Sequence, residues 1–185
     1  QNLIGVLRAP EQWNRIFAKR ELRARDRGEV VEALKKALLA IDPKDADYEN
    51  ARLEILWAFE TIDVVNKPLL STVLSSADYH ARAAAVRVLS QWKGRLDDED
   101  AYLSILAKLV QDEHPRVRLE AVRALARSAR PDAAAIAMQA LSPEMDRFLE
   151  YALWTTLRET KEYWLPEMER LAFSRDAEKM LYALK

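Results

Sequence analysis

The alternation of polar and apolar positions repeats along this chain at intervals of 30 to 37 residues. In each repeat an anchor residue, usually Arg, is followed by an apolar residue three positions later and by another four positions after that. Residues spaced by three and four lie on one face of an α-helix, so the pattern predicts one amphipathic helix per repeat. The anchors and their apolar partners are Arg15 with Ala18 and Leu22, Arg52 with Ile55 and Phe59, Arg82 with Ala85 and Leu89, Arg118 with Ala121 and Leu125, and Glu150 with Leu153 and Leu157.

Intervals of this length hold two helices and a turn, and they are too short for independent domains. The chain is therefore expected to be all-α, an α-solenoid of stacked helical hairpins in which residues 1–185 form a single array of about five repeats. The expected helices cover residues 10–26, 29–41, 48–63, 66–76, 79–93, 99–111, 115–129, 131–141, 144–159, 162–174 and 176–184.

Prolines and a glycine are expected to mark the helix ends. Proline is favoured in the first turn of a helix, and glycine takes the left-handed conformation that often follows the last turn. Gly94 is expected in that second role. The prolines expected at helix starts are Pro10, Pro115, Pro131, Pro143 and Pro166.

Small side chains at two of the apolar positions indicate close packing. Ala85 and Ala121 allow neighbouring helices to approach closely. We expect both positions to be buried and intolerant of charge, because a charged residue there would have no partner in an apolar interior.

Composition narrows the possible chemistry. The formal net charge is -1, so the molecule as a whole has no field that would attract nucleic acid or an acidic membrane. The absence of cysteine removes disulfides, thiolate nucleophiles, Cys-ligated zinc, iron–sulfur clusters and covalently attached c-type haem from this chain. No apolar run approaches the roughly 20 residues needed to cross a bilayer, so we expect no membrane insertion.

The residue types most often used in catalysis and metal binding stand alone in the sequence. His80 and His114 are the only histidines, and neither has a second ligand at metal-binding spacing, so we expect them to cap helices or face solvent. The hydroxyl side chains considered as nucleophiles have no partnered base: Ser71, Ser75, Ser76 and Thr155. We therefore expect no catalytic residue, no cofactor and no metal site in this chain.

The acidic run from Asp97 to Asp100 contains four carboxylates that could hold a cation. It lacks the alternating ligands and the glycine of a calcium-binding loop. We expect it instead to favour the positive end of the following helix.

The stretch 112–126, with a Val-Arg pair followed by Ala-Val-x-x-Leu, resembles the second helix of a HEAT repeat. At the level of the repeat the resemblance covers nearly the whole chain. It implies that the first helix of each hairpin lies on the convex side and the second on the concave side. It also implies that the anchoring arginines bond to the inter-helix turn or the neighbouring repeat and form a structural ladder: Arg15, Arg52, Arg82 and Arg118.

A narrower resemblance is carried by residues 51–59 and by residues 149–166, which contain Tyr-Ala-Leu-Trp. Both look like the HEAT segment of large bacterial exported proteins of the membrane-bound dehydrogenase type, in which a β-propeller precedes the repeats and a c-type haem domain follows them. The resemblance implies a piece of a longer chain in the periplasm or cell envelope. No propeller site and no Cys-x-x-Cys-His motif occur here, so the implied role is a noncatalytic scaffold that links or docks neighbouring domains.

Arginines at equivalent positions of three predicted second helices, Arg20, Arg87 and Arg123, suggest a binding surface. Trp57 replaces Arg at that position in the second repeat, and Arg116 and Arg127 lie on the same predicted helix as Arg123. Arginine offers planar bidentate donors, so a strip of them on the concave side suits an acidic protein partner of a freestanding adaptor. The alternative is a solvated face neutralised by Glu54, Glu60 and Glu120. The candidate partner-binding residues are Arg20, Trp57, Arg87, Arg116, Arg123 and Arg127.

An enzymatic alternative is a HEAT-like DNA glycosylase, which clasps DNA with a basic concave face. Binding to phosphates requires a concentrated positive surface, and the near-neutral charge of this chain disfavours it. HEAT-like iron hydroxylases are disfavoured as well, because they use repeated His-Glu pairs that this sequence lacks.

Overall fold

The computed structural model of the chain describes residues 2–96 and 98–185, and all regular secondary structure within these residues is helical. This finding confirms the all-α class. Internal contacts divide the chain into two compact units, Gln1–Trp92 and Lys93–Lys185.

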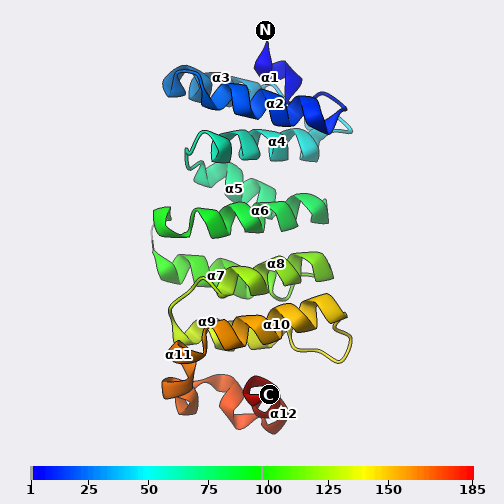
Figure 1. Ribbon diagram of the computed structural model, residues 1–185. Helices are drawn as coiled ribbons and strands as arrows, with labels where there is room; N and C mark the ends of the chain where they lie inside the picture. The colour runs from blue at the N-terminus through cyan, green and yellow to red at the C-terminus, as the bar shows by residue number, and fades with distance from the viewer. Residues whose placement is uncertain (1, 97) are drawn as a thin grey trace. The chain divides into compact units, whose positions relative to one another are not determined.

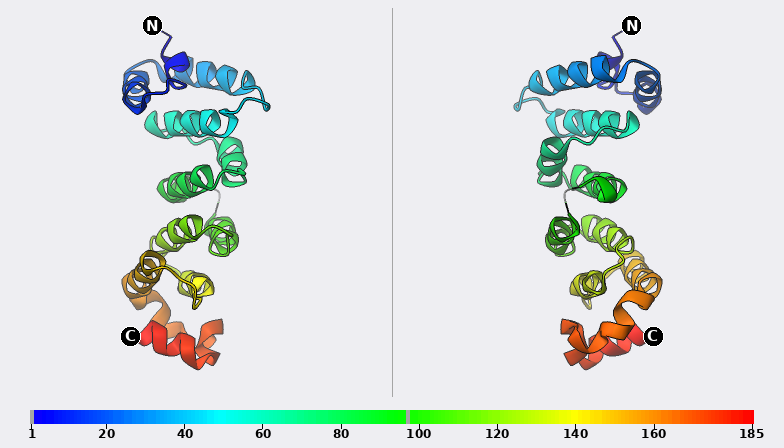
Figure 2. Two further views of the ribbon diagram at one scale, coloured as in Figure 1. Left: turned by 90° about the vertical axis from the view of Figure 1, so that its right-hand side faces the viewer. Right: turned by 90° about the vertical axis from the view of Figure 1, so that its left-hand side faces the viewer.

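The first unit is built from helical hairpins. Its helices are α1 (Leu3–Val6), α2 (Gln12–Arg23), α3 (Arg27–Leu39), α4 (Tyr48–Thr61), α5 (Lys67–Leu74) and α6 (Tyr79–Gln91). The helices pack as successive pairs: α1 with α2, α3 with α4, and α5 with α6 (Figure 1). The second helices of these pairs also contact one another, α2 with α4 and α4 with α6. Within this unit, α2, α4 and α6 lie on one side and α3 and α5 on the other (Figure 2).

The second unit continues this hairpin pattern. Its α-helices are α7 (Glu99–Leu109), α8 (Pro115–Leu125), α9 (Pro131–Ala137), α10 (Arg147–Glu159), α11 (Lys161–Trp164) and α12 (Ala177–Leu184). Helix α7 packs on α8 and α9 on α10, while the second helices α8 and α10 contact each other. Short 3-10 segments complete the unit: η1 (Lys93–Arg95), η2 (Met138–Ala140), η3 (Leu165–Arg170) and η4 (Ala172–Arg175).

The repeating apolar positions form the core of both units. Every apolar residue that follows an anchor by three or seven positions is buried, and none is more than 5% exposed. Ala18, Ala85 and Ala121 are fully buried. Because burial of a leucine-sized side chain contributes about 2 kcal/mol, this stripe is a main source of stability in each hairpin. The periodicity therefore predicted correctly which face of each second helix is buried.

Short polar side chains fix where the helices begin. Each capping side chain accepts a hydrogen bond from a backbone N–H in the first turn, a contact whose loss typically costs about 1 kcal/mol. Asp146 accepts two such bonds at the start of α10, from Phe148 and Leu149, at 2.9 and 2.8 Å. The other capping residues include Asp26 for α3, Asn66 for α5, Asp78 for α6, Asp98 for α7 and His114 for α8.

Helix α4 ends in a left-handed residue that is not glycine. Asp63 has φ 59°, its N–H donates to the carbonyl of Glu60 at 3.0 Å, and the N–H of Val64 donates to the carbonyl of Phe59 at 2.9 Å. This pair of bonds is the Schellman arrangement, which satisfies carbonyls at a helix end. The sharp turn leaves Asp63 beside the connection between α2 and α3.

The predicted helix over residues 162–174 is wrong. Helix α11 ends at Trp164, and the 3-10 segments η3 and η4 follow it. Pro166 explains the break, because its ring has no N–H to donate and clashes with the preceding turn of an α-helix.

Other expected boundaries also differ. Pro10 and Pro143 lie outside helices, because α2 begins at Gln12 and α10 begins after the Asp146 cap. Gly94 lies within the 3-10 segment η1, and no glycine among the described residues has a positive φ. Pro115 and Pro131 do occupy first helical turns.

Replacing Ala121 with Asp is expected to destabilise the protein by about 3 kcal/mol or more, because the carboxylate would be buried without a partner between packed helices. Ala129, which is exposed in the same unit, provides the control: Ala129→Asp should change the free energy of unfolding by less than about 0.5 kcal/mol. Urea denaturation of both variants measures the difference. Equal stabilities would show that position 121 is not close-packed.

Candidate functional site

Three of the four anchoring arginines are tied to the turn of their own hairpin. Each donates from Nη1 to the carbonyl oxygens five and six residues earlier in the chain. The distances are 2.7 and 2.8 Å for Arg15, and 2.9 and 3.1 Å for both Arg82 and Arg118. Carbonyls at a hairpin turn have no helical partner, so the guanidinium supplies one and holds the turn to the second helix.

Arg52 is bound differently. Its Nη2 donates to Glu49 at 2.5 Å, its guanidinium lies 4.2 Å from the centre of the Tyr48 ring, and its Nε has no hydrogen-bond partner. Ser76 donates to the same carboxylate oxygen of Glu49. Arg52 is therefore anchored to the first turn of its own helix and, through Glu49, to the hairpin that follows.

A buried carboxylate on α4 collects two basic side chains from α2. Glu54 is 2% exposed; Arg15 Nε donates to it at 2.8 Å, and Lys19 Nζ donates to its other oxygen. The Lys19 Nζ atom also lies 5.1 Å from the centre of the half-buried Trp57 ring. Trp57, a candidate for partner binding, thus packs beside a cation from the adjacent second helix, in a cation–π contact.

Helix α8 carries the densest group of candidate residues. Arg116, Arg123 and Arg127 are all exposed. Arg116 and Arg123 are seven positions apart on α8 and therefore share a face. Arg127 lies in the turn after α8, because the helix ends at Leu125 and not at residue 129 as the sequence predicted. Between Arg116 and Arg123 lies Glu120, which is 3% exposed. Glu120 accepts a hydrogen bond from Arg123 Nη1 at 3.4 Å and forms an ion pair with Arg116, whose Nη2 lies 3.2 Å from Oε1. The buried carboxylate fixes the two guanidinium groups, whose side chains remain 50% and 62% exposed.

The remaining candidate residues lie on separate helices of the first unit. Arg20 on α2 and Arg87 on α6 are both exposed. The structure therefore places the six candidates in two groups: Arg20, Trp57 and Arg87 in the first unit, and Arg116, Arg123 and Arg127 in the second. A single strip joining all six residues stays a prediction.

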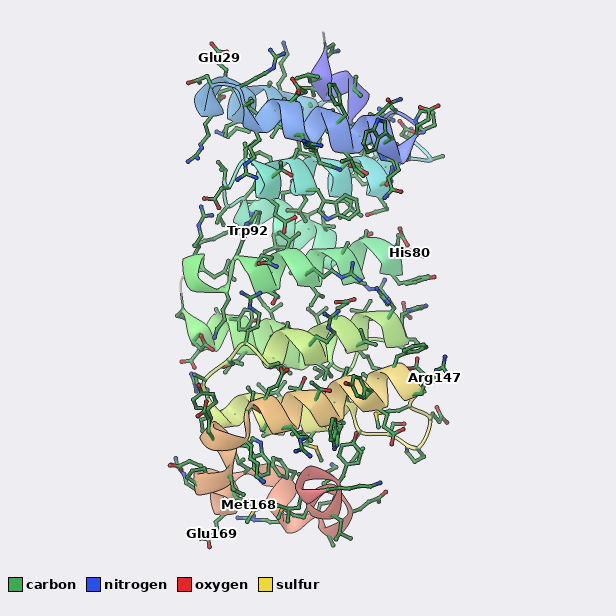
Figure 3. The ribbon with its side chains drawn as sticks, viewed as in Figure 1. Glu29, His80, Trp92, Arg147, Met168 and Glu169 are labelled. Atoms are coloured by element: carbon green, nitrogen blue, oxygen red, sulfur yellow. The ribbon has the colours of Figure 1, made fainter. Side chains whose placement is uncertain are left out.

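The histidines occupy local structural positions. His114 caps α8, where its Nδ1 accepts from the N–H of Arg116 at 3.2 Å. His80 lies at the N-terminal end of α6 and is exposed, with Nδ1 2.9 Å from an oxygen of Asp78 (Figure 3). Among residues 2–96 and 98–185, no cluster of His, Asp or Glu is arranged to hold a metal ion.

The described part of the acidic run is engaged by protein groups. Asp98 caps α7, and Glu99 accepts from Ser128 at 2.6 Å and lies 3.1 Å from Lys93 Nζ. Asp100 is paired with Arg130. Asp97 lies outside the described residues. These contacts agree with the expected helix-start role and leave three carboxylates of the run facing protein donors.

Sequence reasoning missed a basic hollow in the first unit. Arg23, Arg25 and Arg27 line it together with the end of α4. The Arg-x-Arg-x-Arg pattern was the available signal, but sequence alone did not show that residues 61–63 lie opposite it.

The fold is an α-solenoid of HEAT-like helical hairpins. The family model described as HEAT repeats matches residues 66–155. The HEAT resemblance is therefore confirmed over those residues, whereas the narrower resemblance to dehydrogenase-type proteins finds no support in the comparisons. No curated protein matches the chain.

Two solved structures show a distant likeness. One is the crystal structure of an engineered protein, with 18% sequence identity and a TM-score of 0.47 over 98% of this chain and 92% of that one. The other is a designed armadillo repeat protein in complex with the peptide (KR)4, with 19% identity and a TM-score of 0.46 over 98% of this chain and 95% of that one. Both likenesses are too distant to carry a functional argument.

No helix in the described residues combines the length and the apolar character that crossing a membrane requires.

Replacing Glu54 with Gln is expected to lower the free energy of unfolding by about 2 kcal/mol, because it weakens two charge-assisted contacts and leaves Arg15 and Lys19 poorly compensated. The exposed pair between Glu32 and Lys35 is the control, and Glu32→Gln should cost less than about 0.5 kcal/mol. Chemical denaturation distinguishes the two, and a cost for Glu54→Gln no larger than the control would show that the buried cluster adds no stability.

Glu60→Gln is expected to stabilise the protein at pH 7. Burial raises the pKa of Glu60 above its ordinary value of 4.5, against a smaller opposing effect of Lys19. The folded state therefore binds the proton more tightly, and the stabilisation that protonation gives is lost as pH rises through the raised pKa. At pH 7 the variant should have a free energy of unfolding higher than wild type by a few tenths of a kcal/mol, seen as a higher melting temperature, and the difference should vanish near pH 4. A gain that is equal at both pH values would contradict this assignment.

Proposed function

We propose that this chain is a noncatalytic protein-interaction scaffold whose second-helix arginines bind an acidic segment of a partner protein. The observation that carries the proposal is the α8 face, where Glu120 holds Arg116 and Arg123 while their side chains remain at least half exposed. Exposed long side chains normally lose considerable freedom on binding. A buried carboxylate that already restrains both guanidinium groups lowers that cost.

The chemistry of the α8 face suits carboxylates. Each guanidinium has five N–H donors, and the ion pairs with Glu120 involve Nη2 of Arg116 and Nη1 of Arg123. Both side chains are at least half exposed. Arg127, whose carbonyl oxygen accepts from Lys93 Nζ at 2.6 Å, is exposed as well. Three positive charges around one buried negative charge leave the face with a positive excess, which favours an acidic segment.

A labelled peptide of ten glutamates tests this proposal directly. Arg123→Gln/Arg127→Gln should weaken its binding at least fivefold, because two exposed cations are removed while Glu120 keeps Arg116 as a partner. Arg147→Gln/Arg170→Gln removes two exposed charges elsewhere in the same unit and should leave affinity within twofold of wild type.

Fluorescence anisotropy at low and high salt gives the readout. Affinity of the wild type should fall as salt rises, because the surface charges are screened. Equal affinities of the two double variants, or binding that does not depend on salt, would contradict the α8 assignment. Circular dichroism and thermal melting confirm that both variants remain folded.

The proposal extends to the setting in which such a scaffold works. By resemblance of residues 51–59 and 149–166, the chain serves as the repeat segment of a larger exported redox protein, linking or docking its neighbouring domains in the periplasm or cell envelope. A reading frame that encodes Cys-x-x-Cys-His beyond the repeats supports this setting. A frame without propeller or haem motifs favours the freestanding adaptor, and the peptide experiment stands in either case.

A further inference from the structure

We propose that the hollow between the α2–α3 connection and the end of α4 is a binding site for a phosphate group in its dianionic form. The site lies in the first unit, apart from the α8 face. It is lined by three arginines within five residues, Arg23, Arg25 and Arg27, and its volume is about 420 Å³. Small-molecule sites in proteins typically measure about 300–1,000 Å³, so the hollow has room for a phosphate and the group that bears it.

Several other arginines of the first unit are paired with carboxylates. Arg8 is paired with Asp45, and Arg15 and Arg52 are bound to buried or half-buried carboxylates. Within the described residues, Arg23, Arg25 and Arg27 make no ion pair, side-chain hydrogen bond or cation–π contact, and all three are exposed. Their donors are therefore available to a ligand.

The carboxylate nearest in sequence does not neutralise the group. Asp26 lies between Arg25 and Arg27, but its Oδ1 accepts from the backbone N–H of Glu29 at 2.9 Å and caps α3. The capping bond points this carboxylate at the backbone. Among the described residues the three guanidinium groups therefore have no ion pair with a side chain of their own segment, and their exposed donors can take an anion from solvent.

Local electrostatics account for only part of the arrangement. Arg23 ends α2, where the helix dipole favours a cation. Arg27 is the first residue of α3, where the dipole disfavours one. An anion shared by the three guanidinium groups explains a cation at that unfavourable position.

The remaining lining residues determine the kind of anion. Leu22 and Ile62 are buried apolar residues, Thr61 turns its hydroxyl to the carbonyl of Trp57 at 2.7 Å, and Asp63 contributes one negative charge. The three arginines outnumber the single carboxylate of the lining, and this positive excess suits a phosphomonoester, which carries about −1.5 to −2 at pH 7. A second hollow of comparable size is lined by Arg158 and Lys161 with Glu159 and Glu162, so it has no such excess.

Titration with inorganic phosphate, followed by NMR of the arginine Nε–H signals, tests the site without any substitution. Saturable shifts confined to Arg23, Arg25 and Arg27 are expected at constant ionic strength. Shifts that are linear up to tens of millimolar, or spread evenly over all exposed arginines, would overturn the proposal.

A charge-matched pair of variants gives an independent test. Arg23→Gln/Arg25→Gln/Arg27→Gln should weaken phosphate binding at least tenfold in calorimetry. Lys35→Gln/Lys36→Gln/Lys44→Gln removes three charges from the same unit away from the hollow and should leave it within twofold. Equal weakening by both would show a general charge effect and sink the assignment. Both triple variants should keep the wild-type melting temperature within a few degrees, because the arginine changes are on exposed side chains.

The source of the phosphate is resolved by a second titration. A phosphoserine peptide that binds more tightly than its unphosphorylated form, and that loses this advantage in the arginine triple variant, identifies a phosphorylated protein segment. Equal binding of both peptides, with inorganic phosphate still bound, identifies a small free phosphate ligand. Arg123→Gln/Arg127→Gln should bind phosphate as wild type does, so failure at α8 and failure at the hollow are distinguishable.

Discussion

Close packing between successive second helices is the constraint on which the rest of each unit depends. Ala18, Ala85 and Ala121 are fully buried at the repeat positions where these helices meet their neighbours. A short hairpin cannot bury its apolar face alone, so it gains stability only when the next hairpin covers it. The same proximity excludes water from polar groups beside the apolar stripe, and these groups need protein partners.

The charged residues near that stripe follow from this need. Glu54 and Glu120 are each buried on a second helix, and each is held by two basic side chains. The two sites differ in how exposed the basic side chains around the glutamate are. Around Glu54 the cations Arg15 and Lys19 are mostly buried, whereas the arginines around Glu120 are at least half exposed. The same motif is thus structural in the first unit and leaves donors for a partner in the second.

Sequence predicted the features that depend on residues close together in the chain, and it did not predict those that depend on contacts between distant segments. The second helices and their buried faces depend on spacings of three and four, which the sequence displays directly. Residues 162–174 kept a helical composition, yet Pro166 ended α11 early, and Arg52 found an aromatic ring and Glu49 in place of turn carbonyls. Arg20, Arg87 and Arg123 are exposed, as expected for positions of the second helices that lie outside the buried apolar stripe. The hollow was not predictable, because it depends on Asp63 adopting a left-handed turn opposite residues 22–27.

The two proposed binding surfaces place opposite demands on a ligand because their internal charges differ. On α8 the buried Glu120 satisfies part of each guanidinium, so an incoming carboxylate competes with a fixed internal one, and affinity has to come from several weak contacts along an acidic segment. In the hollow no side chain of the same segment competes, because Asp26 is committed to the α3 backbone. A single compact dianion can then collect donors from three arginines at once. A scaffold with the two proposed surfaces binds an extended acidic segment at the α8 face and a compact phosphate group in the hollow.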